Sequence, residues 1–198
     1  LTRHINMSVA EVTEQYADLL VRTTDGLFGE HLRPMRQSIR TLNKSKRELK
    51  NLRRRETLCL RRAEPPVAGI RLLRQMLYGL IRIAEPAYEH VDNHFSPIDA
   101  TFAARYTKLR TEFTELIAEI AGNFRNQRSE DNDALMARCS EIRSELHNLG
   151  QEIGVAIQTT DVNLTAITLM LHLVQETEQL LVEVKELLKN TKLYREMV

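Results

Sequence analysis

Residues 102–124 read FAARYTKLRTEFTELIAEIAGNF, and this stretch decides the fold class. Its apolar residues recur at steps of three and four, which is the spacing of one face of an α-helix. Residues 135–156 repeat the pattern without a break. Because a helix with one apolar stripe buries that stripe against its neighbours, the two patterns predict long helices in a helical bundle.

Three further helical patterns occupy the first half of the chain. A capping box, Ser8-Val-Ala-Glu11, predicts the start of the first helix, since its hydroxyl and carboxylate can satisfy free backbone amides. Pro65-Pro66 separates the second pattern from the third, because proline lacks the amide hydrogen that a helix needs. We therefore expect helices over about residues 8–29, 31–62 and 67–93.

The second half begins with Ser96-Pro97-Ile98-Asp99, which combines an N-cap residue with a proline at the first helical position. This pattern predicts the start of the fourth helix, and Thr159-Thr160-Asp161 predicts the cap of a sixth. Short connections between long helices favour antiparallel neighbours. The sequence therefore predicts an all-α fold of six long antiparallel helices. They form either two three-helix bundles, at residues 1–95 and 96–198, or one elongated bundle.

Composition and motifs limit the function. With 198 residues, 42% of them hydrophobic, the chain is long enough to bury a sizeable core. The two cysteines, Cys59 and Cys139, are isolated, as is typical of thiols in a reducing compartment. The sequence contains no glycine-rich phosphate loop, no G-x-S-x-G and no HExxH, so we expect a noncatalytic protein. Because the first residue is Leu rather than an initiator Met, we expect a piece of a longer protein.

The predicted second helix is strongly basic. Between His31 and Arg62 there are twelve Lys and Arg residues but two acids, Glu48 and Glu56. This excess favours either an anion-binding ridge or a solvated helix whose arginines pair with acids on neighbouring helices. The anion could be phosphate, an anionic lipid surface or an acidic partner. Nucleic acid is disfavoured because no aromatic residues interleave with the cations. The ridge has a cation every seven residues and one added lysine: Arg33, Arg40, Arg47, Arg54 and Lys50.

Acids and histidines gather near the end of the predicted third helix. Steps of about 100° per residue place Glu85 and Glu89 on one face and His90 and His94 roughly opposite. The helix could therefore offer oxygen ligands or imidazoles to a divalent or trivalent cation, with a second segment completing the site. The alternative is an ordinary polar helix face. A bend at Pro86 would free backbone carbonyls that can also serve a site.

The predicted sixth helix carries a second set of candidate ligands. His172 and Glu176 are four residues apart, so one face of the helix presents both. Glu178 falls within the apolar arc, where an unpaired charge is costly, and needs a partner such as an arginine or a metal ion. The alternatives are an exposed polar pair and a helix end that leaves the core.

Two segments resemble a known family. Residues 76–97 read MLYGLIRIAEPAYEHVDNHFSP and are similar to a segment of some bacterial inorganic phosphate transporters of the PiT type. In those proteins a soluble PhoU-like helical region, built from two three-helix repeats, follows the membrane domain. The basic run at residues 49–60, LKNLRRRETLCL, adds to the resemblance. The resemblance implies a noncatalytic regulatory domain on the cytoplasmic face of the inner membrane, within a larger membrane protein.

The resemblance also implies partners and a metal motif. The partners would be the membrane domain of the same transporter or an anionic lipid surface, with phosphate and a second copy of the chain as further candidates. PhoU-like repeats often carry an acid-x-x-x-acid metal motif. Here Ile81 precedes Glu85 at that spacing and His172 precedes Glu176, whereas Glu85 and Glu89 preserve it one turn later. The match to the family's multinuclear iron or zinc clusters is therefore incomplete, and Glu85 with Glu89 could form one residual cation site.

Two other functions stay open on sequence alone. A stand-alone cytoplasmic helical protein could bind metal through Glu85, Glu89, His90 and His94, or sense phosphate. A helical interaction module would use its apolar faces to recruit partner helices. Metal analysis of the purified chain distinguishes the first of these, and a monomer with six buried stripes would argue against the second.

Overall fold

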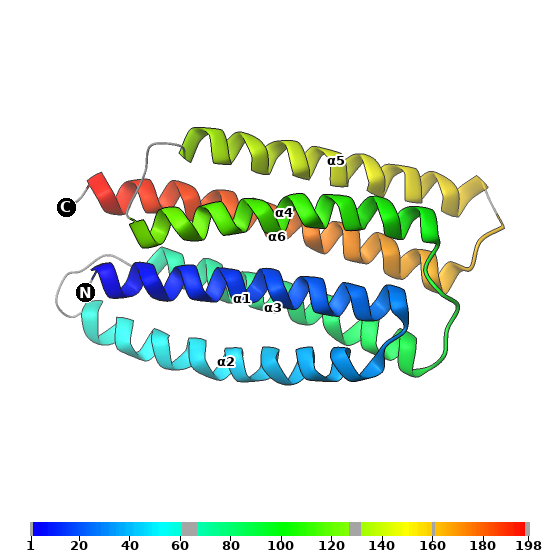
Figure 1. Cartoon of the computed structure of the whole chain (residues 1–198), viewed down its shortest axis with the longest axis horizontal. Helices are drawn as coiled ribbons and strands as arrows, with labels where there is room; N and C mark the ends of the chain where they lie inside the picture. The colour runs from blue at the N-terminus through cyan, green and yellow to red at the C-terminus, as the bar shows by residue number, and fades with distance from the viewer. Residues whose placement is uncertain (1, 61–66, 127–131, 160, 197–198) are drawn as a thin grey trace.

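The computed structural model describes residues 2–60, 67–126, 132–159 and 161–196, with side chains placed within 9–51, 71–126, 132–159 and 161–189. Within these ranges it contains six long α-helices and no strand (Figure 1). The helices are α1 (Thr2–Gly29), α2 (Leu32–Leu60), α3 (Val67–Asp92), α4 (Ala100–Asn126), α5 (Asn132–Thr159) and α6 (Leu164–Glu196). The all-α class and the six helices predicted from the apolar periodicity are confirmed.

Successive helices run antiparallel, and α2 and α5 form the two outer edges of the molecule (Figure 1). In the described part of the chain, α2 contacts only α1 and α3, and α5 contacts only α4 and α6. The inner helices meet across the middle, where α1 packs on α4 and α3 packs on α6. The first three and the last three helices, called here the two groups of helices, therefore pack directly on each other and share one continuous apolar core.

The stripe that decides the fold class lies in this core. In α4 the buried apolar residues are Tyr106, Leu109, Phe113, Leu116, Ile117, Ile120, Ala121 and Phe124, and Phe102 packs against them partly buried. Each large apolar side chain that is fully buried contributes about 1.5–3 kcal/mol of transfer free energy. Cys139 is also buried, as expected of a core thiol, whereas the Cys59 side chain lies outside the described residues. The periodicity therefore predicted correctly which face of this helix is covered.

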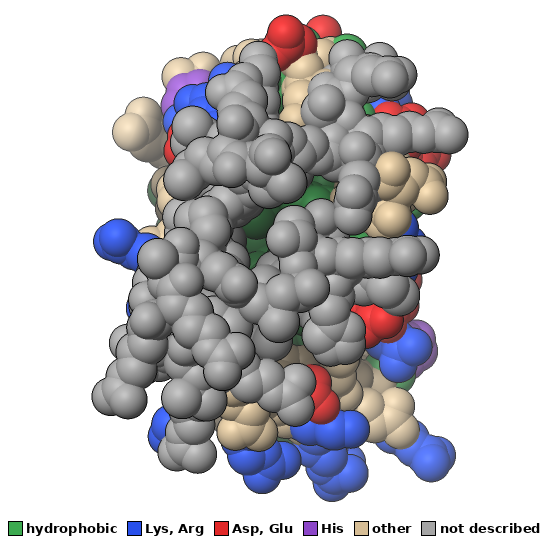
Figure 2. All heavy atoms as spheres, turned by 90° about the vertical axis from the view of Figure 1, so that its left-hand side faces the viewer, with side chains coloured by type: hydrophobic (Ala, Val, Ile, Leu, Met, Phe, Trp, Pro, Cys, Tyr) green, Lys and Arg blue, Asp and Glu red, His purple; other side chains and the backbone are tan. Residues whose placement is uncertain are grey.

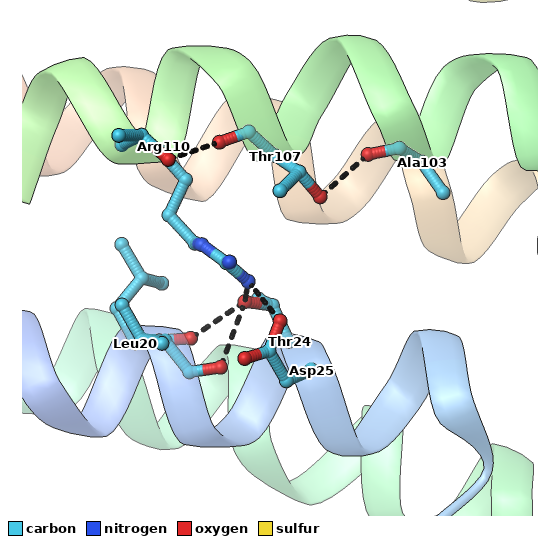
Figure 3. A network of polar contacts seen from close by, with 8 residues as sticks. Leu20, Thr24, Asp25, Ala103, Thr107 and Arg110 are labelled. Atoms are coloured by element: carbon cyan, nitrogen blue, oxygen red, sulfur yellow. Dashed lines mark hydrogen bonds and ion pairs between the residues drawn. The ribbon is translucent and has the colours of Figure 1, made fainter.

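Buried polar contacts join the two groups of helices (Figure 3). Arg110 of α4 reaches α1, where its Nη1 donates to Thr24 Oγ1 at 2.8 Å and to Asp25 Oδ1 at 2.6 Å. Thr24 Oγ1 in turn donates to the carbonyl of Leu20 at 2.7 Å. A buried donor without an acceptor costs about 1–3 kcal/mol, so these contacts set the position of α4 against α1.

Two predicted helix starts in the second half are wrong. Ser96 does not cap α4, because the helix begins at Ala100 and the amide of Phe102 donates to Asp99 Oδ1 at 3.0 Å. Thr159-Thr160-Asp161 does not cap α6, because Asn163 Oδ1 accepts from the amide of Ala166 at 3.0 Å. In both cases another residue with an N-capping side chain stands closer to the first turn, and it takes the bond.

The predicted start of α1 is wrong as well. The helix begins at Thr2, so Ser8-Val-Ala-Glu11 lies inside it and does not cap it. No glycine or proline interrupts the residues before Ser8, so the helix can continue toward the N-terminus. None of the described helices has the length and apolar character that a membrane crossing requires.

α3 continues through Pro86, and this has a consequence for α6. The carbonyl of Arg82, four residues earlier, loses its helical donor because proline has no amide hydrogen. His172 of α6 supplies a replacement, since its Nε2 lies 2.8 Å from that carbonyl oxygen and donates to it. The proline and the histidine therefore act together in joining α3 to α6.

Candidate functional site

The outward side of α2 carries a line of cations. Of its side chains within residues 32–51, seven are Lys or Arg and one, Glu48, is acidic. Steps of about 100° per residue separate the buried residues from five of the cations. The buried line is Met35, Ser38, Leu42, Ser45 and Leu49, and the exposed line is Arg33, Arg36, Arg40, Lys44 and Arg47. We call the exposed line the α2 ridge.

The α2 ridge follows an outer edge of the molecule. Lys and Arg side chains crowd the lower edge in Figure 2, which is the side on which α2 lies in Figure 1. The ridge is straight because its members follow one another at steps of three, four, four and three residues along one helix. At 1.5 Å per residue, it extends for about 21 Å from Arg33 to Arg47. Its cations therefore lie in a row and do not converge on a point.

Few acids neutralise the ridge. Lys44 Nζ lies 3.9 Å from Glu48 Oε1, and Arg36 Nε donates to the hydroxyl of Tyr88 at 3.1 Å. Arg33, Arg40 and Arg47 form no ion pair with any acid among the placed side chains. The hypothesis that these arginines pair with acids on neighbouring helices is therefore wrong for these three.

The two remaining members of the predicted basic site differ in what the structure shows. Lys50 is exposed beside the ridge and also has no acidic partner within the described residues. The side chain of Arg54 lies outside those residues. The structure therefore brings Arg33, Arg40 and Arg47 to one exposed face, with Lys50 at its border.

α3 extends the basic surface on one side. Lys46 Nζ lies 5.6 Å from the centre of the Tyr78 ring, which itself is exposed. Arg36 likewise lies against Tyr88. Lys46 is ten residues after Arg36 on α2, and Tyr78 is ten residues before Tyr88 on α3, so the two antiparallel helices stay in step along this length. Four residues beyond Lys46, Lys50 is therefore level with Arg74 of α3. Just beyond the C-terminal end of the α2 ridge, the basic surface thus includes a cation of α3 at the level of Lys50.

The histidines and acids at the end of α3 are not brought together. Glu85 and Glu89 are exposed, and His94 is exposed in the connection to α4 with φ at 56°. His90 is buried, and its Nε2 donates to the carbonyl of Ser96 at 2.7 Å. This bond closes the corner between α3 and α4 and gives His90 a structural role.

The candidate ligands on α6 each contact a different partner. His172 bonds to the carbonyl of Arg82, and Glu176 Oε1 accepts from Arg82 Nε at 3.0 Å. Glu178 lies 3.8 Å from Arg143 Nε and 3.3 Å from His147 Nδ1, both on α5. The arginine partner considered for Glu178 is thus present across the bundle.

No metal cluster is assembled by these residues. Among the described side chains, no three His, Cys, Asp or Glu lie together in a way that could hold a metal ion. An open groove of about 410 Å³ between α3 and α6 is bordered by both His90 and His172. Each of these histidines, however, uses its Nε2 on a backbone carbonyl. The groove is otherwise lined mainly by apolar groups such as Pro86, Phe95 and Leu169.

Two buried charged residues were missed from the sequence. Arg110 is four residues after Tyr106 and three before Phe113, so its position on the buried arc of α4 was visible in the spacing. Glu183 of α6 is 5% exposed, and burial raises its pKa to about 7. A hydrogen bond from Gln179 and the charge of Arg82 oppose this rise in pKa, while Glu176 adds to it.

Comparison of the chain with protein-family models, with curated proteins and with solved structures found no match.

Proposed function

We propose that this chain is a noncatalytic regulatory domain of an inorganic phosphate transporter, and that α2 is its contact with an anionic surface. The observation that supports this most directly is the α2 ridge, in which Arg33, Arg40 and Arg47 are exposed and have no acidic partner among the placed side chains. Unneutralised cations in a row attract an extended anionic partner.

Sequence and architecture support the transporter assignment. Residues 76–97 and 49–60 resemble the soluble PhoU-like region of PiT-type transporters. Six long helices are the number that two three-helix repeats require. In such a protein the domain would lie at the cytoplasmic face of the membrane. There α2 would face the membrane-embedded part of the transporter or the lipid around it.

A regulatory role fits the way the polar residues are used. His90 closes the corner between α3 and α4, and His172 completes the backbone hydrogen bonding of α3. Arg82, Arg110 and Glu178 join helices to one another. Among the placed side chains, Arg33, Arg40 and Arg47 of α2 are exposed and form no ion pair. We take the exposed basic side of α2 as the docking edge that a domain acting through its neighbours requires.

Phosphate uptake by the transporter that carries this domain tests the proposal. Replacement of Arg33, Arg40, Arg47 and Arg54 by Gln is expected to change the uptake rate or its response to external phosphate. A matched control replaces four exposed cations elsewhere, Arg22, Lys108, Arg143 and Lys189, by Gln. Uptake and regulation that stay at the wild-type level in the first variant would refute the proposed role of α2.

A further inference from the structure

The basic face of α2 has a shape that selects among anionic ligands. It combines the α2 ridge with Lys46 and Lys50 at its border and with Arg74 of α3 at the level of Lys50. The cavity beside Tyr16 and Leu49, the groove beside His90 and the cavity beside Phe102 are not lined by a cation of this face. A single phosphate ion is bound by donors that converge on it, whereas these cations point outward along a helix. The face therefore suits an extended anionic surface.

We infer that this face docks flat on an anionic lipid bilayer. This inference rests on the proposed function for its setting and names the partner of the same site. The apolar side of α2 is covered by α1 and α3, as the burial of Met35, Leu42 and Leu49 shows. Within residues 32–51 no apolar stripe of this helix is left to enter the hydrocarbon, so the attraction is between side-chain cations and lipid headgroups. Each Lys or Arg near such a surface contributes about 1 kcal/mol.

The charge distribution over the whole molecule orients it on such a surface. α5 forms the opposite edge, and its charged residues include four exposed acids, Asp133, Glu141, Glu145 and Glu152, against two arginines. A planar anionic surface attracts the α2 edge and repels the α5 edge, although the formal net charge of the chain is only +1. The acids of α3, Glu85 and Glu89, lie toward the other end of the helix from Arg74. They leave the C-terminal half of the face basic.

Nucleic acid fits these observations less well. The described part of α2 has no aromatic residue on which a base could stack, and the near-neutral chain lacks the overall positive charge typical of nucleic-acid-binding domains. The one exposed aromatic ring beside the face, Tyr78, already lies against Lys46. A tyrosine with an apolar body and a polar tip is common at the boundary between a membrane and water.

Cosedimentation of the whole chain with vesicles tests the inference. The vesicles contain phosphatidylglycerol mixed with phosphatidylcholine, or phosphatidylcholine alone, at about 0.1 M and about 0.5 M NaCl. We expect binding to the anionic vesicles only, and release at the higher salt, where the Debye length falls to a few Å. Absence of binding to anionic vesicles at the lower salt would overturn the inference.

Charge reversal locates the contact. The variant Arg40→Glu, Lys44→Glu, Arg47→Glu is expected to bind anionic vesicles at least about a hundredfold more weakly than the wild type. The control Arg22→Glu, Lys108→Glu, Lys189→Glu changes the net charge equally on other helices and is expected to keep most of the binding. Equal losses in both variants would overturn the inference. If the first variant does not fold by circular dichroism, the same comparison is made with Gln in place of Glu.

Competition separates the lipid from other anions. Low-millimolar inorganic phosphate should release the chain no better than NaCl of equal ionic strength, and specific release by phosphate would overturn the inference. Tighter binding to duplex DNA than to the anionic vesicles at equal salt would also overturn it. The proposed regulatory role is decided separately. A domain that docks only on the membrane protein would alter phosphate uptake when α2 is neutralised and would still not bind vesicles.

Discussion

At the scale of single residues, His172 has a role that its position four residues from Glu176 did not indicate. Its Nε2 donates to the Arg82 carbonyl that Pro86 leaves without a helical donor. Replacing His172 by Ala removes this bond, and we expect a loss of about 1–2 kcal/mol in the free energy of unfolding. Urea denaturation monitored by circular dichroism measures the change.

The proline provides the control for this prediction. In the variant Pro86→Ala the helix regains an amide hydrogen for the Arg82 carbonyl, so the histidine becomes less important. The cost of His172→Ala should then be smaller in the Pro86→Ala background than in the wild type. Equal costs in the two backgrounds would show that the hydrogen bond to Arg82 is not the source of the effect.

Glu183 makes stability depend on pH. Burial raises its pKa to about 7 in the folded chain, above the value of about 4.3 expected when unfolded. Between these two values the folded state holds a proton that the unfolded state has released, so stability falls as pH rises through this window. We expect Glu183→Gln to raise the free energy of unfolding by about 2 kcal/mol more at pH 8 than at about pH 4.

Urea denaturation at the two pH values measures this difference. Other groups also titrate in this range, so the informative quantity is the variant minus the wild type at each pH. Glu186→Gln, at an exposed position three residues further along α6, serves as the control and should show no such difference. A Glu183→Gln effect that is the same at both pH values would contradict the raised pKa.

At the scale of elements, α1 ends in a conformation that its sequence does not favour. Glu30 has φ at 58°, the amide of His31 donates to the carbonyl of Gly26 at 2.8 Å, and the amide of Glu30 points back to Leu27 at 3.4 Å. Glycine usually occupies this position because a side chain in the left-handed region costs about 1–2 kcal/mol. A glycine at this position would avoid that cost, but part of the advantage would be offset by the greater conformational entropy of glycine in the unfolded chain.

Replacing Glu30 by Gly should therefore stabilise the fold by about 0.5–1 kcal/mol. Thermal unfolding followed by circular dichroism would detect the corresponding rise in Tm. Glu30→Ala is the matched control, because it removes the same carboxylate but keeps a Cβ in the left-handed region. A similar gain for both variants would mean that the charge of Glu30, and not its backbone conformation, is the unfavourable element.

At the scale of the whole molecule, the two groups of helices depend on each other through Arg110. Its side chain is 8% exposed, whereas its partner Asp25 is 59% exposed. Removing Asp25 leaves a buried cation with fewer acceptors. Removing the arginine leaves only an exposed carboxylate without its partner, and water can solvate it. We expect Asp25→Ala to cost about 1–3 kcal/mol and Arg110→Met to cost less.

Chemical denaturation of the two single variants and of the double variant tests this order. In the double variant the buried charge is gone, so Asp25→Ala should then cost little. Asp25→Ala could instead cost the same in the wild type and in the Arg110→Met background. The contribution of Asp25 to stability would then not come from its ion pair with Arg110.

Much of the fold and part of the candidate site could be predicted from the sequence. The spacing of Tyr106, Leu109 and Phe113 was sufficient to predict a buried helix face, because helical periodicity is a local property. The same holds for Arg33, Arg40 and Arg47, whose common face follows from seven-residue steps along one helix. The helix starts were less accurate, since several capping residues compete within a few positions.

Other features were decided only by the tertiary structure, because they join residues far apart in the chain. The His172 side chain meets the Arg82 carbonyl 90 residues away, and Arg110 meets Thr24 across 86 residues. Whether the arginines of α2 had acidic partners likewise depended on which helices lie beside it. Periodicity along one helix specifies which residues share a face, but only the packing of the helices determines which face lies opposite and which charges are left unpaired.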